Sequence, residues 1–348
     1  MAEYDKAVVF LCYKQELFVE AAVRSLLSQS VPVHAWLLDD ASPDTTWQRV
    51  LACLSEPRCE NDTSHKLEPC RAVVNGGLAK NWNRAIPHLT EEWIYVFEGD
   101  DVSNPERIDL CDRFIRAHPS LAVLSCRVME CSATGTREVP PRGMGGIFGA
   151  GSIKALDFPD MPGCSLAVRR DVFSVFGKLN RRLLTVDSIL IRRGLMLGDA
   201  GLLDETLVSY RKHDSNVSRV FDLRYDSLKS FRHSMLSIQR HTLGSLHEFK
   251  KLWRYGLRNG GAGTARVILA KRIYLETRAH AALGLALASG SRRQLFMTAA
   301  ANILSRKEYK VSQRALALAV WSRTWSVWGA CKQRLRAVMN LLRGREKR

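Results

Sequence analysis

Several features are scarce or missing in this 348-residue chain, and each absence excludes a class of protein. No apolar run reaches the roughly 18 residues that a membrane-spanning helix needs; the longest candidate, 279–290, is too short. The first residues lack the basic segment and long apolar stretch of a secretory signal, so we expect none. The nine cysteines include no C-x-x-C pair. We therefore expect reduced thiols in a cytosolic protein rather than a disulfide framework or a zinc site.

Acidic residues are scarce only in the last third of the chain. Residues 241–348 hold 22 Lys and Arg against 4 Asp and Glu, a net charge of +18, whereas residues 1–240 hold 30 against 31, a net charge of −1. With 46% hydrophobic residues, the chain can bury a sizeable core. We expect two parts with different roles: an α/β domain over 1–220 and a basic helical region over 221–348.

Short apolar runs alternate with segments of helical spacing in the first part. The expected strands are 7–12, 34–38, 71–74, 93–97 and 205–211. The expected helices are 16–29, 45–54, 78–89, one that opens at 104–106, and 187–193. This alternation predicts a mostly parallel, doubly wound sheet flanked by helices. Residues 133–163, rich in Gly and Pro, read as a long functional loop, and the pattern from about 221 onward is helical.

Two acidic pairs each follow a predicted strand. Asp39 and Asp40 end the second strand, and Asp100 and Asp101 follow the fourth. Ligands of an open parallel sheet bind beyond the carboxyl ends of its strands, so both pairs should face one crevice. Adjacent carboxylates repel each other unless a cation compensates them, and carboxylate oxygens suit a divalent cation that also binds phosphate. The alternative is that these residues are ordinary helix N-caps.

Five motifs along residues 7–218 occur in the order found in family 2 glycosyltransferases, which the chain resembles. They are 12–16 with 38–42, 75–80 with Asn83, 98–101, 163–165 with Arg169 and Arg170, and 210–218. The E-G-D-D sequence at 98–101 resembles the acidic D-x-D-D motif of that family. The resemblance implies a GT-A fold and an inverting transfer from a nucleotide-sugar, most often a UDP-sugar, with Mn²⁺ or Mg²⁺ as cofactor. The acceptor would be a glycan or a lipid-linked glycan, as in surface polysaccharide biosynthesis.

The resemblance also implies a role for individual residues. The donor nucleotide would be bound by Cys12, Tyr13, Glu16, Asp40, Lys80, Asn83 and Asp100. The metal would be held by Asp101 with Asp100 and His213, and the acceptor side would include Cys164 and Ser165. Asp187 falls where the family keeps its catalytic base, which removes the proton of the acceptor hydroxyl. The alternatives are a helix cap for Asp187, a structural His213 and a solvated Lys80.

Three positions depart from the family pattern. The first acid of the metal motif is Glu98 rather than Asp. Because its side chain is longer, we expect Glu98 not to bind the metal directly. The usual Glu-Asp pair at the base reads Val186-Asp187, so the base lacks a neighbouring acid. The usual Asn after the first aromatic residue is Lys14. These departures affect the donor preference and the metal geometry without removing the essential Asp residues.

The basic C-terminal region carries its own pattern. Trp321, Trp325 and Trp328 lie on one helical stripe with Lys and Arg interspersed. This combination is typical of a segment that binds an anionic membrane surface, and it predicts a cytoplasmic enzyme held at the inner face of the membrane. The alternatives are a core-packed helix or an oligomer contact, while nucleic-acid binding is disfavoured because no such motif is present. A non-catalytic scaffold on a degenerate fold is the second function class, against which the intact Asp residues argue.

Overall fold

The computed structural model describes residues 4–56, 65–132, 135–138, 145–151, 161–214, 216–217, 228–260 and 264–288. The chain divides into two compact units, Met1–Thr277 and Arg278–Arg348. The first unit is described below, and of the second only the helix that continues to residue 288 is described. The Trp321 stripe and two serines of the closing motif, Ser215 and Ser218, lie outside the described residues.

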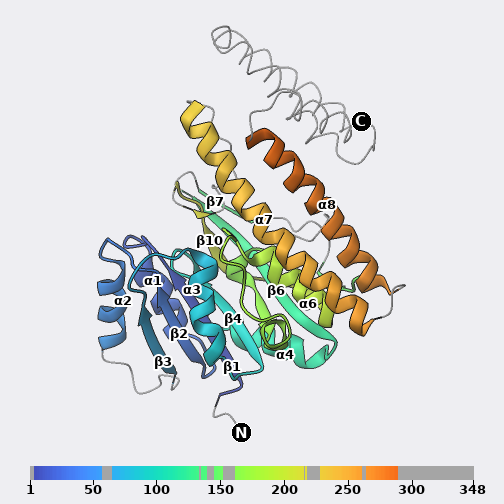
Figure 1. The fold of residues 1–348 in the computed structure, drawn as a ribbon. Helices are drawn as coiled ribbons and strands as arrows, with labels where there is room; N and C mark the ends of the chain where they lie inside the picture. The colour runs from blue at the N-terminus through green and yellow to red at the C-terminus, as the bar shows by residue number, and fades with distance from the viewer. Residues whose placement is uncertain are drawn as a thin grey trace. The chain divides into compact units, whose positions relative to one another are not determined.

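A mixed sheet forms the centre of the first unit, with the strand order β3-β2-β1-β4-β9-β6-β10-β5 (Figure 1). The strands β1 (Lys6–Cys12), β2 (His34–Asp39), β3 (Lys66–Arg71) and β4 (Trp93–Glu98) run parallel. β9 (Ala167–Arg169) lies antiparallel between β4 and β6 (Leu121–Ser132), and β10 (Asp199–Arg211) lies parallel to β6. The short strands β5 (Val102–Ser103) and β8 (Gly146–Phe148) pair with β10, and β7 (Gly135–Glu138) pairs with β6.

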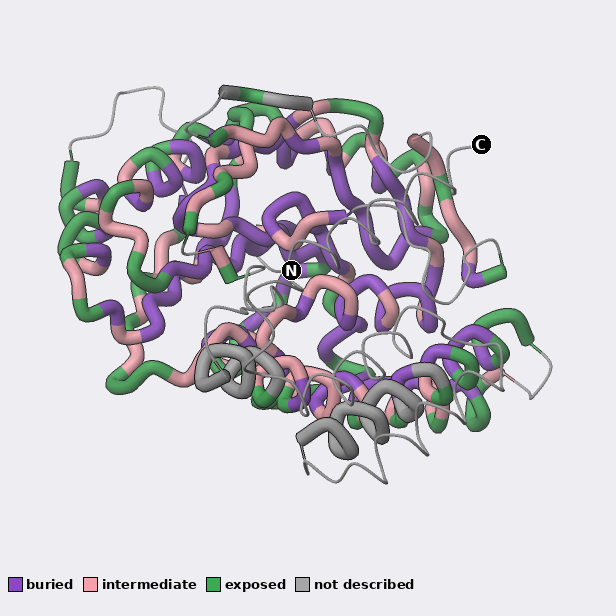
Figure 2. The backbone as a smooth tube through the Cα atoms, turned by 90° about the horizontal axis from the view of Figure 1, so that it is seen from above, coloured by how far each residue is buried: buried purple, intermediate pink, exposed green. Residues whose placement is uncertain are grey.

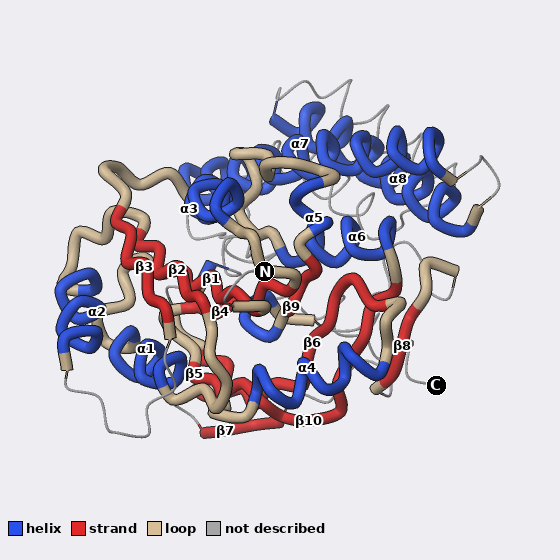
Figure 3. The backbone as a smooth tube through the Cα atoms, turned by 90° about the horizontal axis from the view of Figure 1, so that it is seen from below, coloured by secondary structure: helices blue, strands red, loops and turns tan. Residues whose placement is uncertain are grey.

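Helices cover both faces of this sheet (Figure 3). One layer contains α1 (Val19–Leu27), α2 (Thr46–Ser55) and α4 (Arg107–Ala117). The opposite layer contains α3 (Leu78–Ala85), α5 (Asp171–Ser174), α6 (Asp187–Leu197), α7 (Leu228–Asn259) and α8 (Ala265–Ala288), of which residues to Thr277 belong to this unit. Two short 3-10 turns complete the set, η1 (Ile86–His88) and η2 (Gly163–Ser165).

Strand β1 shows why the sheet is doubly wound. Its side chains alternate between two apolar cores, with Val8 and Phe10 in one and Val9 and Leu11 in the other. Such a continuous apolar run is typical of a strand that is buried on both faces. Figure 2 shows buried residues along the strands and exposed residues on the outer turns of the helices. The predicted α/β fold with a mostly parallel sheet is therefore confirmed.

One predicted strand was misplaced, and one long strand was not predicted. The third strand is Lys66–Arg71 rather than 71–74. Pro69 argues against a strand, but β3 is the edge strand of the sheet, where Pro costs no ladder hydrogen bond. The longest missed element is β6, a 12-residue strand. The segment expected as a loop, 133–163, contains the short strands β7 and β8 among its described residues.

The helical region begins inside the first unit rather than as a separate domain after residue 220. α7 buries Phe249 and Leu252 in the core beneath α6. A buried ion pair joins the two helices, because Arg193 Nη2 lies 2.6 Å from Glu248 Oε2 and both side chains are fully buried. The structural division falls at 277/278, which differs from the expected boundary at 220/221. Within the described residues, no helix has the length and apolarity to span a bilayer.

Candidate functional site

The candidate site lies at the carboxyl ends of the central parallel strands. Cys12 ends β1 and pairs in register with Asp39, which ends β2, while Leu11 pairs with Glu98, which ends β4. The turn after β4 carries Asp100 and Asp101. Parallel strands bring their ends to one edge of the sheet, so both acidic pairs of the sequence lie at this edge.

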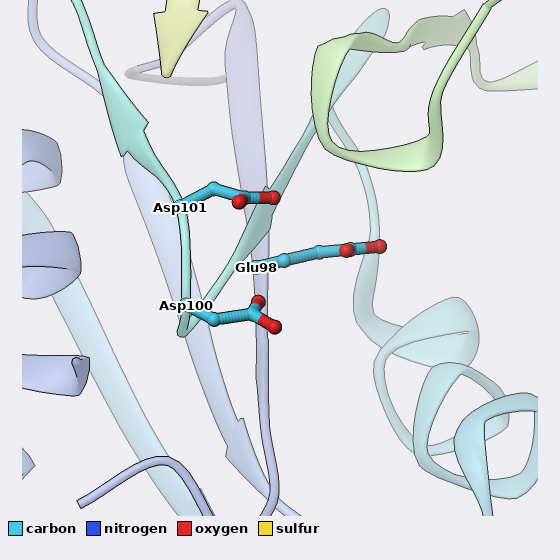
Figure 4. A group of neighbouring side chains, drawn as sticks. All are labelled: Glu98, Asp100 and Asp101. Carbon is cyan, nitrogen blue, oxygen red and sulfur yellow. The ribbon is translucent and has the colours of Figure 1, made fainter. Parts of the chain in front are cut away.

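Three carboxylates form a cluster at this edge. One oxygen from each of Glu98, Asp100 and Asp101 lies within 4.8 Å of the others, and the side chains point to the same side (Figure 4). Asp100 Oδ1 and Asp101 Oδ2 are buried and accept no hydrogen bond. Glu98, which we expected outside such a group, is part of it. Buried oxygens without donors need a positive partner, so the cluster fits a divalent cation.

The electrostatics of the cluster point the same way. Removal from water and the charges of Asp101 and Asp100 raise the pKa of Glu98 well above its usual value. Desolvation and the charge of Asp100 raise the pKa of Asp101 to about 7. Each shift reports that the ionised form lacks compensation in the protein alone. A bound divalent cation would supply that compensation.

The end of β10 and the residues after it anchor the two aspartates. Asp101 Oδ1 accepts the backbone N–H of Arg211 at 2.7 Å. Asp100 Oδ2 lies 2.9 Å from His213 Nε2 and accepts from Asn216 Nδ2 at 3.3 Å. His213 is therefore adjacent to the carboxylate cluster, as the motif order suggests. These contacts join the closing motif to the acidic motif across more than 100 positions of sequence.

Phe18 connects a third segment to this group. Its ring lies 4.7 Å from the His213 ring and 4.6 Å from the Arg211 guanidinium carbon. The residues after β1 and those after β10 therefore meet beside the carboxylates. The guanidinium of Arg211 rests on an aromatic face, and the described residues offer it no carboxylate within ion-pair distance. This arrangement leaves a cation available beside the cluster.

Asp187 lies close to one member of the cluster, Glu98. It is the first residue of α6, and removal from water raises the pKa of its carboxyl group against backbone hydrogen bonds that lower it, one of them from Gly163. A Cβ on Gly163 would lie 2.9 Å from Asp187 Oδ1 and 3.0 Å from Glu98 Oε1. The two carboxylates therefore converge on the same small residue. The expected base and the first acid of the metal motif therefore lie beside each other, in space that a side chain at position 163 would enter.

Asp40 and Asp39 have different partners. Asp40 accepts the N–H groups of Gly76 and Gly77 at 3.0 and 2.7 Å, and Asn75 Nδ2 donates to it at 2.9 Å. Asp40 therefore holds the turn before α3, and its two carboxylate oxygens already accept hydrogen bonds from that turn, so they are not free to accept from a nucleobase. Asp39 is fully buried and accepts from the Ser42 backbone and hydroxyl. Both aspartates therefore bind the backbone of the loops that follow β2 and β3.

The remaining residues expected at the donor divide into exposed and anchored ones. Tyr13 is exposed, with Lys14 Nζ 5.5 Å from its ring centre. Cys12 is buried, and its thiol lies 3.7 Å from the Leu38 carbonyl oxygen. Glu16 Oε2 accepts from the Thr45 N–H and hydroxyl before α2. Tyr13 is thus the member of this group that is open to a ligand.

Two α3 residues expected at the donor behave differently from each other. Lys80 is exposed and its side chain lies over Gly76, close to the turn that Asp40 holds. Asn83 instead bonds at both polar atoms to the backbone of Leu179, at 2.8 Å each. Its amide therefore fixes the segment before α6 to α3 and is not directed at the carboxylates.

The expected acceptor residues are buried. The Cys164 thiol is buried near Asp101, and removal from water together with the Asp101 charge raises the pKa of this thiol well above its usual value. Ser165 Oγ lies 2.7 Å from Ser125 Oγ and donates to the Pro162 carbonyl at 2.7 Å. Both side chains are therefore buried next to the cluster, and the part of η2 that lies beside Asp187 and Glu98 is Gly163.

Sequence reasoning missed Arg107. Its guanidinium is buried, donates to Ser103 Oγ at 2.8 Å and to the Val96 carbonyl at 3.1 Å, and lies 4.8 Å from the Phe97 ring centre. Its charge lowers the pKa of Glu98 against the larger effects that raise it. A signal was available, because Arg107 is the first residue of a helix, where the dipole disfavours a cation. An arginine there indicates compensation by acids elsewhere.

Comparisons with known proteins agree with this geometry. Residues 7–177 match the family model described as glycosyl transferase family 2. Over 150 residues the chain is 26% identical to the assigned glycosyltransferase EpsE of Bacillus subtilis (strain 168), a match that covers 42% of this chain and spans about half (52%) of EpsE. Crystal structures of S. aureus TarS 1–349 with UDP-GlcNAc and with UDP are similar at TM-scores of 0.54 and 0.53. Both share 17% identity and cover 92% of this chain and 91% of theirs. The likeness to TarS establishes a common fold.

Proposed function

Because residues 7–177 belong to glycosyl transferase family 2, we propose that the chain transfers a sugar from a nucleotide-sugar to an acceptor hydroxyl, with inversion at the sugar carbon. The observation that carries the proposal is the convergence of the Glu98–Asp100–Asp101 cluster and Asp187 on Gly163. One group of acids suits the diphosphate end of a donor and the separate acid suits an acceptor proton. We propose a UDP-sugar as the donor, in line with the nucleotides bound by TarS.

The carboxylate cluster would hold Mn²⁺ or Mg²⁺. Asp100 and Asp101 offer buried oxygens without donors, and Glu98 completes the group. The cation would neutralise charge on the departing diphosphate without proton transfer. Arg211, held on the ring of Phe18 with its backbone bonded to Asp101, adds a second positive group at this end. Charge that develops on the leaving group would therefore meet preorganised partners.

Asp187 would act as general base. Its carboxyl pKa is raised by desolvation, which moves a carboxylate toward the range in which it accepts a proton well near neutral pH. Asp187 and Glu98 both lie beside Gly163, and we propose that Asp187 serves the acceptor while Asp100 and Asp101 serve the leaving group on the opposite side of the sugar. Inversion requires this opposition of the two faces.

The outer parts of the site would bind the rest of the donor. Tyr13 is open to a nucleobase, and the turn at 75–77 that Asp40 holds would border it. Lys80 lies beside the same turn and can reach a phosphate. Cys12, Glu16 and Asn83 would support these groups through their backbone contacts. The acceptor would be a glycan or lipid-linked glycan that enters beside η2, where Cys164 and Ser165 shape the backbone.

The location that fits such an acceptor is the inner face of the cytoplasmic membrane. The basic C-terminal region supports this proposal through its charge of +18 over residues 241–348. The alternative, a non-catalytic scaffold, would need neither a cation site nor an acid placed opposite it. The retained carboxylates at 98, 100, 101 and 187 therefore favour the enzyme.

Calorimetry with UDP tests the donor end. We expect binding in the presence of Mn²⁺ that weakens strongly with EDTA, and Asp101→Asn should lose most of the metal-dependent part. Asp109→Asn, a change of the same type on α4, is the control and should bind as the parent protein does. Equal affinity with Mn²⁺ and with EDTA would refute the metal role.

Turnover of the nucleotide-sugar that binds best tests the base. Asp187→Asn should lower the rate of UDP release by roughly 10²–10⁴-fold, because the amide accepts no proton, while UDP affinity stays within about twofold. Retained turnover would place the base elsewhere. A parallel loss of UDP affinity would show that Asp187 is structural.

A further inference from the structure

The side of α7 that faces away from the core is basic and partly apolar. Lys250, Arg254, Leu257 and Arg258 are all exposed, and their spacing of three and four residues keeps them on one side of the helix. The other side of α7 carries Phe249 and Leu252, which are buried in the core. The basic side of α7 therefore lies opposite the side that packs in the core.

The first part of α8 repeats this arrangement. Ile268 is 56% exposed and Leu275 is 45% exposed, and Lys271 lies between them on the same side. α7 and α8 lie side by side in Figures 1 and 3, and the Trp253 and Tyr274 rings meet at 5.1 Å. Since both helices bury their other sides in the same core, their exposed sides form one surface. We call it the α7–α8 face.

The face has almost no negative charge to balance its cations. Residues 228–277 contain ten Lys and Arg but only two acids, Glu248 and Glu276. Glu248 is fully buried and is paired with Arg193 and Lys251. No ion pair is recorded for Lys250, Arg254 or Arg258 among the described residues. The positive charge of this surface is complementary to an anionic partner.

We propose that the α7–α8 face docks on the surface of an anionic lipid bilayer. Charge alone would also attract a polyanion such as a nucleic acid, but a polyanion offers nothing to Leu257, Ile268 and Leu275. A bilayer interface accepts both kinds of side chain, because cations meet lipid phosphates while apolar side chains enter the headgroup boundary. Two adjacent helices lying flat would present these groups together.

This docking rests on the membrane location proposed above, to which it assigns a surface, but it depends neither on sugar transfer nor on the Trp321 stripe. Lipid binding can be measured without any donor, so its failure would leave the proposed enzyme unaffected. Each cation held near an anionic surface strengthens binding by a factor of about five. Loss of three cations from the face should therefore weaken binding roughly 100-fold at low salt.

Co-sedimentation of the full chain with phosphatidylcholine vesicles, with and without phosphatidylglycerol, tests the proposal. The face variant is Lys250→Gln with Arg254→Gln and Arg258→Gln. The control is Arg24→Gln with Arg49→Gln and Arg113→Gln, which removes the same charge from exposed positions on α1, α2 and α4. We expect binding that requires phosphatidylglycerol, falls with salt, drops roughly 100-fold in the face variant and changes less than about fivefold in the control.

A second variant separates lipid from other partners. Ile268→Ser with Leu275→Ser keeps every charge and should weaken vesicle binding while leaving any binding to a DNA duplex unchanged. Equal vesicle binding by the face variant and the parent would overturn the proposal and assign membrane binding to the C-terminal residues. Stronger binding to DNA than to anionic vesicles, unaffected by the serine variant, would overturn it in favour of a polyanion. A dimer that the face variant dissociates, without lipid binding, would overturn it in favour of a second copy.

Discussion

Gly163→Ala should place a methyl group between the two carboxylates that the proposed reaction needs. The new Cβ would lie 2.9 Å from Asp187 Oδ1 and 3.0 Å from Glu98 Oε1, whereas ordinary contact begins at 3.4 Å. One or both carboxylates must therefore move by about half an ångström. The φ of Gly163 lies outside the left-handed region, so the backbone itself accepts alanine.

The size of the effect follows from this displacement. A misplacement of about 1 Å costs on the order of 10²-fold in rate, so half of that should lower kcat by about 10-fold. Donor KM should change less than kcat, because Glu98 is the one member of the carboxylate cluster among the nearest neighbours of the new Cβ. Overpacking should lower the free energy of unfolding by about 1–3 kcal/mol, which leaves the protein folded at 25 °C. Steady-state UDP release and a thermal melt measure both quantities.

Gly151→Ala is the matched control. Its Cβ would meet Ala265 Cβ at 3.6 Å, which is ordinary contact, so kcat and melting temperature should stay near the parent values. Unchanged kcat in a folded Gly163→Ala variant would refute the reasoning, because it would show that these carboxylates do not take part in the reaction. If the lost activity returns in Gly163→Ala with Glu98→Asp, the contact with Glu98 is the one that limits the rate.

Four further outcomes follow from buried charges. Because the pKa of Asp101 is raised to about 7, Mn²⁺ affinity measured by calorimetry should rise from pH 6 to pH 8 and then level off. The metal-free protein should instead lose stability in thermal melts as pH rises from about 4 to about 7, since ionisation is disfavoured only in the folded state. Glu248→Ala should destabilise by about 3–5 kcal/mol in urea titrations because it leaves Arg193 buried without its partner, and replacing both residues by Met should cost less. Arg107→Met should lower the free energy of unfolding, and Arg107→Lys should lower it less because the charge is kept. Equal free energies of unfolding for the two variants would show that the buried charge at position 107 does not stabilise the fold.

The fold could be read from the sequence where local patterns determine it. β1, β2 and β4 are short apolar runs that end in polar residues, and their ends meet where the parallel sheet requires. β3 was misplaced because Pro69 argues against a strand unless the strand lies at an edge, which only the topology reveals. The place of α7 depends on Arg193 and Glu248, which are 55 positions apart. No local pattern predicts such a pair.

The candidate site divides in the same way. The cluster could be predicted in part, because Asp100 and Asp101 follow the end of a single predicted strand, β4, while Glu98 was expected outside it. The partners of Asp40 and Asn83 could not be predicted, because each bonds to backbone groups whose positions depend on the folded chain. Residue type alone thus indicated where polar side chains gather but not which of them remain open to a ligand. Tyr13 is exposed, Arg211 is half-buried against the Phe18 ring, and Asn83 is bonded at both polar atoms to the Leu179 backbone.

Two departures from the family pattern have one structural consequence. Residue 186 is a buried valine, so Asp187, the proposed base, has no acidic neighbour in sequence. Glu98 has one methylene more than Asp, and its carboxylate reaches Gly163, where Asp187 also lies. A second carboxylate therefore stands beside the base, supplied by β4 instead of by residue 186. Taken one at a time, Glu98 would place its carboxylate farther from its backbone than Asp does, and Val186 would leave the proposed base without an acidic neighbour. In the folded chain the same side chain joins the carboxylate cluster and flanks the base, and Gly163 leaves the space in which both acids fit.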